Sequence, residues 1–177
     1  MSLVPVTLVL GGARSGKSAF AESLCAAVAR PVYVATGEAR DTEMADRIRR
    51  HRERRGAHWT TVEEPLDLVA ALRAHAAADG VVLVDCLTLW LANLLWAGRD
   101  IDAEREALCA TLAGIAGPVV LVSNEVGLGI VPDNAAARAF RDHAGRLHQD
   151  IAALAERVYF TVAGIATPIK NIRDQSR

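Results

Sequence analysis

The residues with the clearest chemistry form a glycine-rich segment near the start of the chain, Gly11-Gly12-Ala13-Arg14-Ser15-Gly16-Lys17-Ser18. The segment matches the pattern G-x-x-x-x-G-K-[ST] and lies between an apolar run and a helical pattern, as a phosphate-binding loop requires. Its glycines allow successive backbone N–H groups to face one point, where a helix N-terminus adds partial positive charge. We therefore predict a nucleoside triphosphate site, with Lys17 at the β- and γ-phosphates and the Ser18 hydroxyl on Mg²⁺. The alternative is a glycine-rich turn that only joins a strand to a helix.

Asp85 is the candidate for a second magnesium ligand. It ends the aliphatic run Val81–Asp85, and the carboxyl ends of parallel strands gather around the ligand in sheets of this kind. The same position also suits a cap for the helix that follows in DCLTLW. The two roles are compatible, so the sequence leaves both open.

A histidine in the segment 42–55, TEMADRIRRHRERR, is the candidate nucleophile. Met44, Ile48 and His51 are spaced i, i+4 and i+7, so His51 shares a helical face with apolar residues. A histidine in that position is more often packed in a core than catalytic. The chemical alternative is that a neutral imidazole, whose ordinary pKa is about 6.5, attacks an α-phosphate and forms a labile phosphoramidate. His58, in the sequence GAHW, is the competing candidate.

Arginine dominates the same segment, with six arginines between Arg47 and Arg55. Such a run is usually a solvated helix face and less often a patch that binds nucleic acid. Beside a phosphate loop a third interpretation arises, in which guanidinium groups at the end of the helix hold triphosphate oxygens. On this interpretation Arg52, Arg54 and Arg55 hold the triphosphate, and Glu53, which lies among them, is also assigned to nucleotide binding.

The elements that must position these residues alternate between strands and helices. Strands are expected at Val6–Leu10, Val32–Ala35, Thr60–Val62, Val81–Asp85, Val119–Ser123 and Val158–Val162. Helices are expected at Ser18–Ala29, Thr42–Arg55, Leu66–Ala77, Leu87–Trp96, Ala103–Ala113 and Asn134–Glu156. The alternation predicts one α/β domain spanning residues 1–177, with an open, mostly parallel sheet covered by helices on both faces. Asp133 is the expected N-cap of the last helix, and Trp96–Ala103 is the expected mobile surface loop.

The composition narrows the classes of function. With 51% hydrophobic and 5% aromatic residues, the core must be mainly aliphatic, as in buried parallel sheets. The net charge of −1 gives no global field that favours nucleic acid or membrane. The three cysteines form no C-x-x-C pair, so neither a disulfide framework nor a zinc site is indicated, and a cytoplasmic location is expected. No apolar stretch reaches membrane-spanning length, and the apolar start of the chain runs into the glycine loop as a first strand would.

Four blocks of the sequence resemble one known family. They are GGARSGKS, VYVATGEA, EMADRIRRHRERRGAHWTTVEEP and LVSNEVGLGIVPDNAAARAFRDHAGRLHQDIA. The pattern R-I-x-x-H-x-x-x-R together with N-E-V-G-x-G-I-V-P-x-N is far more specific than the phosphate loop alone. The resemblance covers nearly the whole chain, including the terminal VAGIATPIK. It is to the bifunctional adenosylcobinamide kinase / adenosylcobinamide-phosphate guanylyltransferase family of cobalamin biosynthesis.

The resemblance implies an activity in two steps. Such an enzyme phosphorylates the aminopropanol hydroxyl of adenosylcobinamide with a nucleoside triphosphate, ATP or GTP, and then transfers GMP from GTP to that phosphate. His51 follows the R-I-x-x pattern and would be the histidine that carries GMP. The family fold is RecA-like and the family assembles as a trimer, so a RecA-like P-loop NTPase domain and a homotrimer are expected. The expected partners are adenosylcobinamide, the nucleotides and Mg²⁺, with no nucleic acid and no membrane insertion.

Further candidate residues follow from their positions in this pattern. Thr36-Gly37-Glu38 follows the second expected strand, where ligands bind in such sheets. Glu63 is either a plain surface carboxylate or the acceptor for the N1–H and N2–H₂ edge of guanine. Glu125, at the end of a strand, is a candidate for orienting a nucleophile or a metal-bound water. A polar stripe on the last helix is either solvated or a corrinoid or subunit contact, and its members are Asn134, Arg138, Arg141 and Gln149.

Two rival functions remain open. The first is a P-loop kinase that phosphorylates another small metabolite. In such an enzyme His51 would be structural, and no covalent adduct with GTP would form. A non-catalytic nucleotide-dependent switch, or a RecA-like module that binds nucleic acid, would use the arginine-rich helix as its contact and bind in a salt-sensitive way. The near-neutral net charge and the lack of an aromatic stacking run argue against such a module.

Overall fold

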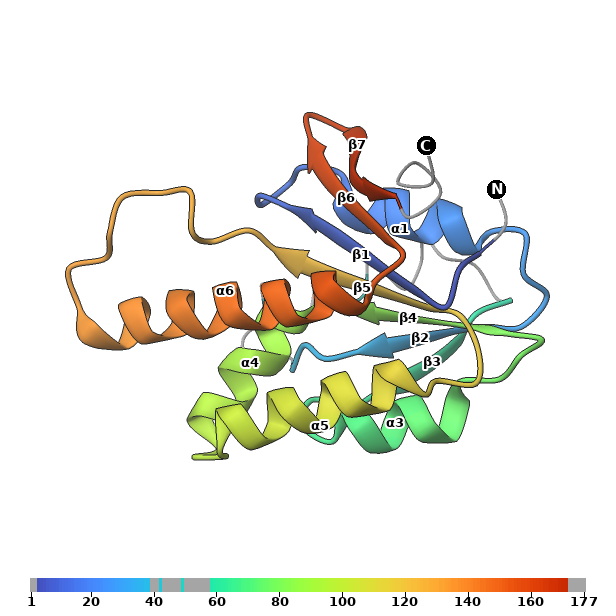
Figure 1. The fold of residues 1–177 in the computed structure, drawn as a ribbon, viewed down its shortest axis with the longest axis horizontal. Helices are drawn as coiled ribbons and strands as arrows, with labels where there is room; N and C mark the ends of the chain where they lie inside the picture. The colour runs from blue at the N-terminus through green and yellow to red at the C-terminus, as the bar shows by residue number, and fades with distance from the viewer. Residues whose placement is uncertain (1–2, 39–41, 43–48, 50–57, 172–177) are drawn as a thin grey trace.

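A mixed β-sheet runs through the centre of the molecule (Figure 1). The computed structural model describes residues 3–38, 42, 49 and 58–171. The strands in that part of the chain are β1 Val6–Gly11, β2 Pro31–Ala35, β3 Thr60–Glu63, β4 Val81–Asp85, β5 Val119–Asn124, β6 Arg157–Val162 and β7 Ile165–Asn171. They form one sheet in the order β3-β2-β4-β5-β1-β6-β7. Neighbouring strands are parallel except for β6 and β7, which are antiparallel.

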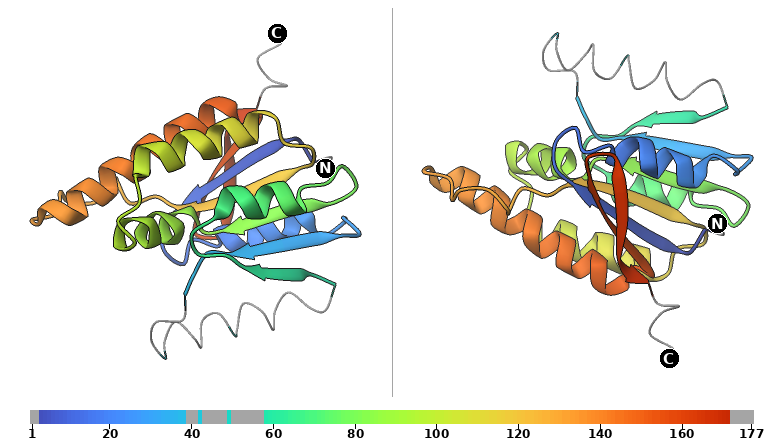
Figure 2. Two further views of the ribbon diagram at one scale, coloured as in Figure 1. Left: turned by 90° about the horizontal axis from the view of Figure 1, so that it is seen from below. Right: turned by 90° about the horizontal axis from the view of Figure 1, so that it is seen from above.

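Helices cover both faces of this sheet, as its aliphatic central strands require. The described helices are α1 Lys17–Cys25, α3 Leu68–His75, α4 Leu87–Trp96, α5 Ile101–Ala113 and α6 Ala135–Leu154. On one face, Ala21 and Cys25 of α1 share a core cluster with Val9 and Val120 of the sheet. α3, α4, α5 and α6 lie on the other face (Figure 2). Their leucines share a second core cluster with Trp90 of α4. The predicted α/β fold, with a mostly parallel sheet and helices on both faces, is confirmed.

The strand order brings distant segments together at one edge of the sheet. β1 lies between β5 and β6, and β4 lies between β2 and β5. The register pairs Gly11 with Asn124, and Ala35 with Asp85. The carboxyl ends of β1, β2, β4 and β5 therefore meet at this edge, where the predicted phosphate loop also lies.

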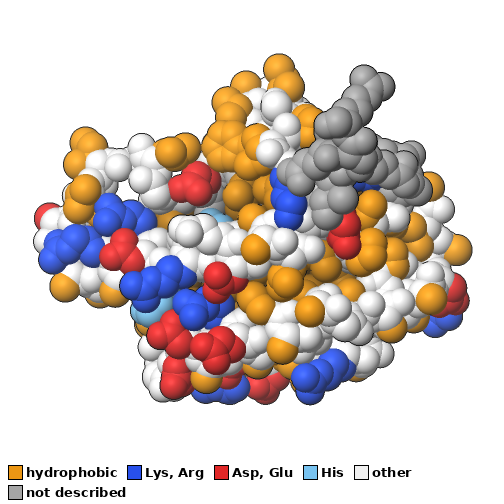
Figure 3. Space-filling model, in the orientation of Figure 1, with side chains coloured by type: hydrophobic (Ala, Val, Ile, Leu, Met, Phe, Trp, Pro, Cys, Tyr) orange, Lys and Arg blue, Asp and Glu red, His pale blue; other side chains and the backbone are white. Residues whose placement is uncertain are grey.

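The sequence pattern does not predict β7. Most of its residues are exposed and it contains Pro168, so it has neither a buried aliphatic run nor a clear alternation. It pairs with β6 through a tight turn in which Ala163 has φ 51° and Gly164 has φ 79°. Positive φ at both central positions suits a two-residue hairpin. Figure 3 shows hydrophobic side chains gathered on this projecting hairpin at the top of the view.

The structure corrects two expected helix starts. Asn134, and not Asp133, caps α6, because Asn134 Oδ1 accepts a hydrogen bond from a first-turn N–H at 2.8 Å. The expected loop Trp96–Ala103 is shorter than predicted, because α5 begins within it. Asp100 caps that helix, and its Oδ1 accepts two first-turn N–H groups at 3.1 Å each. The helix expected over residues 42–55 lies almost entirely outside the described residues.

Candidate active site

The glycine-rich loop connects β1 to α1 at the carboxyl edge of the sheet. Gly11 ends β1, and Gly16 is the N-cap of α1 with φ 93°, in the left-handed region. The turn between β6 and β7 supports the loop, since Gly164 N–H donates to Ser15 O at 2.8 Å. A Cβ on Gly16 would lie 3.0 Å from Gly164 Cα, so the close approach of the two backbone segments requires glycine at position 16. The shape of the loop thus depends partly on the hairpin.

Lys17 directs its charge into this loop. The residue is buried, and its Nζ donates a hydrogen bond to Gly12 O at 3.2 Å. An ammonium group held inside the loop and the partial positive charge of the α1 N-terminus together favour an anion at this point. Ser18, the predicted metal ligand, lies half-buried in the first turn of α1. The arrangement is the one that binding of phosphate oxygens requires.

Asp85 ends β4 close to the loop. Tyr33 Oη donates to Asp85 Oδ2 at 2.9 Å, so the neighbouring strand orients the carboxylate. The alternative role as a helix cap is wrong, because Cys86 occupies the N-cap position of α4. Burial raises the pKa of the Cys86 thiol, the Asp85 charge raises it further, and the Lys17 charge opposes the rise. Asp85 pairs with Val122 of β5, and Asn124, two residues further along β5, pairs with Gly11, so the carboxylate and the phosphate loop lie at the same edge of the sheet.

Thr36, predicted to bind nucleotide, is completely buried and ties β2 to β4. Its Oγ1 accepts a hydrogen bond from Cys86 N–H and donates one to Cys86 O, both at 2.8 Å. Its carbonyl oxygen accepts a hydrogen bond from Asn93 Nδ2 at 2.7 Å. Through these bonds the Thr36 side chain connects the carboxyl ends of β2 and β4. Gly37 is half-buried and Glu38 is exposed, and the nucleotide contacts expected for all three residues stay predictions.

Two polar side chains near the carboxyl ends of β4 and β5 were not predicted from the sequence, Thr88 at the start of α4 and Asn124 at the end of β5. Asn124 Nδ2 donates to Thr88 Oγ1 at 2.8 Å, and Thr88 Oγ1 lies 3.1 Å from Cys86 Sγ. Because Asn124 pairs with Gly11 in the sheet, it lies beside the start of the phosphate loop. The signal available in the sequence was that Asn124 ends a buried aliphatic strand. Its hydrogen-bond partner, Thr88, is evident only from the tertiary structure.

Three polar side chains, Ser123, His148 and Glu125, lie next to one another where α6 meets the end of β5. Ser123 Oγ and His148 Nε2 are 2.7 Å apart, and both residues are buried. The second ring nitrogen, Nδ1, lies 3.9 Å from Glu125 Oε2. Burial lowers the pKa of His148 and the Glu125 charge opposes the shift, so the ring is neutral near neutral pH. Glu125 was predicted, but His148 was missed although its spacing from Ala144 and Ile151 places it on the buried stripe of the helix.

The predicted polar stripe on α6 has local structural roles. Asn134 caps the helix, and Arg138 Nη1 donates to two carbonyl oxygens of the preceding loop at 2.8 and 2.9 Å. Arg141 forms an ion pair with Asp142 at 3.2 Å, and Gln149 is exposed. Part of the stripe therefore shapes the start of the helix, whatever else it contacts.

The remaining predicted residues are exposed or lie outside the described part of the chain. Glu63 is exposed at the end of the edge strand β3. His58 is exposed, and its ring centroid lies 5.9 Å from that of Trp59. Ala13 and Arg14 of the loop are also exposed. The residues outside the described part are His51, Arg52, Glu53, Arg54 and Arg55.

Gly11 and Gly12 form a matched pair for testing how tightly the loop is packed. A Cβ on Gly11 would lie 2.6 Å from both Ser15 Oγ and the backbone oxygen of Thr161, whereas nothing lies within 4 Å of a Cβ on Gly12. Because the strand backbone has no room to move aside, Gly11→Ala should lower the free energy of unfolding by about 1–3 kcal/mol. Gly12→Ala should change it by less than about 0.5 kcal/mol. Urea unfolding without nucleotide measures both values, and equal losses would contradict this packing.

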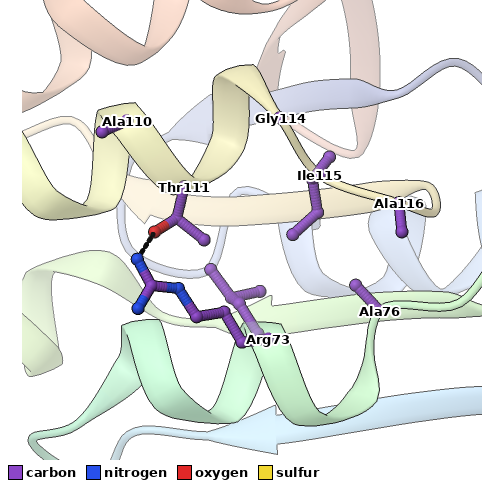
Figure 4. A pocket seen from close by; sticks show the side chains of 8 residues that line it. Arg73, Ala76, Ala110, Thr111, Gly114, Ile115 and Ala116 are labelled. Carbon is purple, nitrogen blue, oxygen red and sulfur yellow. Dashed lines mark hydrogen bonds between the residues drawn. The ribbon is translucent and has the colours of Figure 1, made fainter.

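A cavity between α3 and α5 lies away from this edge (Figure 4). Its volume is about 320 Å³, and Arg73 Nη2 donates to Thr111 Oγ1 at 3.3 Å, joining the two helices. Both helices end beside the cavity and lead into the amino ends of β4 and β5. The cavity is therefore at the opposite edge of the sheet from the phosphate loop and contributes nothing to the site. Its other lining residues are Leu72, Ala76, Ala110, Gly114, Ile115 and Ala116.

Comparison with known proteins identifies relatives along almost the whole chain. Residues 7–169 match the family described as cobinamide kinase / cobinamide phosphate guanyltransferase. The bifunctional adenosylcobalamin biosynthesis protein CobP of Pseudomonas aeruginosa is 55% identical over 166 residues, which cover 92% of this chain and 96% of that protein. The bifunctional adenosylcobalamin biosynthesis protein CobU of Salmonella typhimurium is 43% identical over 178 residues, which cover 92% and 98%.

Solved structures resemble the fold with little identity in sequence. An ATPase from the type III secretion system of pathogenic bacteria matches with a TM-score of 0.54 at 10% identity, over 92% of this chain and 56% of that chain. A protein from Pyrococcus horikoshii OT3 matches with a TM-score of 0.54 at 10% identity, over 99% and 90%. This likeness concerns the fold alone.

Proposed function

This chain belongs to the cobinamide kinase / cobinamide phosphate guanyltransferase family, and from that premise we propose an activity in two steps. In the first step the γ-phosphoryl group of ATP or GTP passes to the hydroxyl group of adenosylcobinamide. In the second step GMP passes from GTP to that phosphate, which gives adenosylcobinamide-GDP and releases pyrophosphate. Both steps occur at phosphorus atoms of a bound triphosphate, so one nucleotide site serves both.

The phosphate loop is the observation that carries this proposal. Lys17 and the N-terminus of α1 concentrate positive potential at one point of the carboxyl edge. Asp85 and Asn124 add polar groups from the neighbouring strands. Phosphoryl transfer needs little from a protein beyond positioning of the reactants and stabilisation of charge. A hydrogen-bonded loop with this electrostatic character supplies both.

His51 is the proposed covalent carrier of GMP in the second step, and it lies outside the described residues. The R-I-x-x-H pattern supports the assignment, and so does the chemistry of imidazole. A neutral ring nitrogen attacks the α-phosphorus, a P–N bond forms as pyrophosphate leaves, and the phosphate on the corrinoid then displaces the histidine. The guanidinium groups of Arg52, Arg54 and Arg55 are proposed to hold the triphosphate together with the loop, and Glu53 is proposed to lie in the same nucleotide site.

Glu63 is the proposed acceptor for the guanine edge. It ends β3 and pairs with Ala35 at the end of β2, so it stands at the carboxyl edge next to Thr36-Gly37-Glu38. A carboxylate accepts hydrogen bonds from guanine N1–H and N2–H₂, groups that adenine does not present together. Its exposure leaves it open to a ligand.

Asp85 and Ser18 fit the small number of protein ligands that Mg²⁺ takes in nucleotide sites. Among the described residues there is no cluster of three or more His, Cys, Asp or Glu side chains that would hold a metal alone. Mg²⁺ on a nucleotide needs only one or two protein ligands, because phosphate and water oxygens complete its shell. Asp85 offers a carboxylate that Tyr33 already orients. When bound, Mg²⁺ would offset the negative charge of the phosphates.

Exposed apolar side chains support the proposed homotrimer. Ile130, in the loop between β5 and α6, is 98% exposed, and the β6–β7 hairpin carries further exposed aliphatic residues. Exposed apolar side chains gathered on a segment favour burial against another protein surface, and copies of this chain are the proposed partners. The exposed residues of the two segments are Leu128, Ile130, Val131, Val162, Ile165 and Ile169.

The cysteines support the proposed cytoplasmic location. All three are free thiols, and burial, together with the nearby Glu22 charge, raises the pKa of Cys25 to about 12. Free thiols persist in reducing compartments.

None of the helices in the described part of the chain is both long and apolar enough to cross a bilayer.

The proposal is tested on the purified wild-type protein with adenosylcobinamide, ATP, GTP and Mg²⁺. Mass spectrometry should show the corrinoid gaining first a phosphoryl group and then GMP, and omission of Mg²⁺ should prevent both gains. Light scattering on the same sample should give three times the chain mass of 18.9 kDa. A corrinoid that gains phosphate but never GMP would favour the rival single-activity kinase, and a corrinoid that gains neither would refute the proposal.

A further inference from the structure

Glu125 lies beside the first glycine of the phosphate loop. Its backbone N–H donates to Gly11 O at 3.0 Å, so the residue after β5 is bonded directly to the first glycine of the loop. Its side chain is 21% exposed, and Oε1 accepts a hydrogen bond from Gly127 N–H. The carboxylate is thus accessible to a ligand above the loop and yet fixed in direction.

The hydrogen bond of Ser123 sets the tautomer of His148 behind this carboxylate. Ser123 is completely buried, and within the described residues its hydroxyl bonds only to His148 Nε2, at 2.7 Å. A buried hydroxyl proton needs an acceptor, so the O–H donates to Nε2. The neutral ring then carries its proton on Nδ1, the nitrogen that lies 3.9 Å from Glu125 Oε2. One carboxylate oxygen therefore receives the Gly127 N–H and the other faces the imidazole N–H.

Serine, histidine and a carboxylate also form the nucleophilic triads of hydrolases, but that role does not fit here. A triad serine must reach the substrate, whereas Ser123 is 0% exposed. Of these three side chains, the carboxylate of Glu125 is the one accessible to a ligand. The group that acts on a ligand must therefore be Glu125, with the histidine and the serine behind it.

We propose that Glu125 accepts the proton of the substrate hydroxyl during phosphoryl transfer and that His148 is the positioning residue that directs it. The inference rests on the proposed function and deepens its first step. The hydroxyl oxygen bonds to the γ-phosphorus, and the bond from that phosphorus to the β,γ-bridging oxygen breaks. The nucleoside diphosphate leaves with that electron pair, and the hydroxyl proton passes to a carboxylate oxygen of Glu125.

The two proposed steps differ in their need for a base. A hydroxyl group must lose its proton as it attacks, whereas a neutral imidazole attacks through a free lone pair and has no proton to lose at that nitrogen. Glu125 therefore matters for phosphorylation of the corrinoid and much less for guanylylation of the histidine. This difference separates a catalytic role from a merely structural one.

Glu125→Gln keeps the size of the side chain and removes the base. The kcat for phosphoryl transfer should fall by about 100-fold or more, with little change in the KM for the corrinoid and a far smaller loss of covalent labelling by α-³²P-GTP. Glu106→Gln, which alters an exposed glutamate on α5, is the matched control and should retain both activities. Equal loss of both activities in Glu125→Gln, or an unchanged phosphoryl-transfer rate, would overturn the proposal. A wild-type protein that lacks phosphoryl transfer would instead refute the proposed function.

His148→Asn and His148→Gln test the positioning role with side chains of similar size. Asparagine places an amide N–H near the position of Nδ1, toward Glu125, whereas glutamine places one near Nε2, toward Ser123. The asparagine variant should retain a kcat several-fold above that of the glutamine variant at the same KM, when both are compared at equal folded fraction by thermal unfolding. Equal rates in the two variants would show that His148 only fills space.

Discussion

Replacement of Lys17 by alanine is expected to lower kcat/KM for both proposed steps by about 100- to 1000-fold. The buried ammonium, bonded to Gly12 O at 3.2 Å, brings a full positive charge into the phosphate loop. Negative charge on the phosphate oxygens shifts as the P–O bond breaks, and a positive charge already held in place beside those oxygens stabilises it strongly. Steady-state kinetics with ATP for the first step and GTP for the second measure the two losses.

Lys170 is the matched control, because it is the only other lysine in the chain. Its Nζ donates to the carbonyl oxygens of Ala152 and Ala153 near the end of α6, at 2.7 and 3.0 Å. Lys170→Ala should lower the free energy of unfolding by about 1–3 kcal/mol, the range for a hydrogen bond to a charged group, and leave both rates unchanged. If Lys17→Ala phosphorylated the corrinoid at the wild-type rate, the model of one shared phosphate site would be contradicted.

His51→Ala is expected to abolish covalent labelling by α-³²P-GTP while phosphoryl transfer to adenosylcobinamide persists. Labelling needs a ring nitrogen at the α-phosphorus, whereas the first step takes place at the γ-phosphorus. The adduct on the wild-type protein should be labile in acid and stable in base, as a phosphoramidate is. Intact-protein mass spectrometry before and after acid treatment measures the gain and loss of one GMP per chain.

His58→Ala provides the comparison for this experiment. His58 is exposed and its ring lies near that of Trp59, so its replacement should disturb the fold little. Labelling should survive in this variant. The assignment of the carrier would move to His58 if labelling persisted in His51→Ala and vanished in His58→Ala.

Much of the fold could be predicted from the sequence because the relevant patterns are local. Aliphatic runs such as Val119–Val122 form strands buried on both faces, and the helical stripe of Ala144, Leu147 and Ile151 packs against the sheet. The segments that were mispredicted are marked by weaker local preferences. β7 is exposed on an edge, and the choice between adjacent Asp133 and Asn134 as cap depends on which side chain turns toward the helix start.

The sequence by itself determined the phosphate loop, the alternation of strands and helices, and the family pattern, because each depends on residues that are contiguous or a few positions apart. Only the tertiary structure decided which distant groups meet. The order β4-β5-β1-β6 sets Asn124 against Thr88, and the β6–β7 turn against the loop at Ser15. The packing of α6 on β5 likewise joins Ser123 and Glu125 to His148. Strand order and helix packing result from burial of the whole core, and no short segment of sequence encodes which neighbour a strand end acquires.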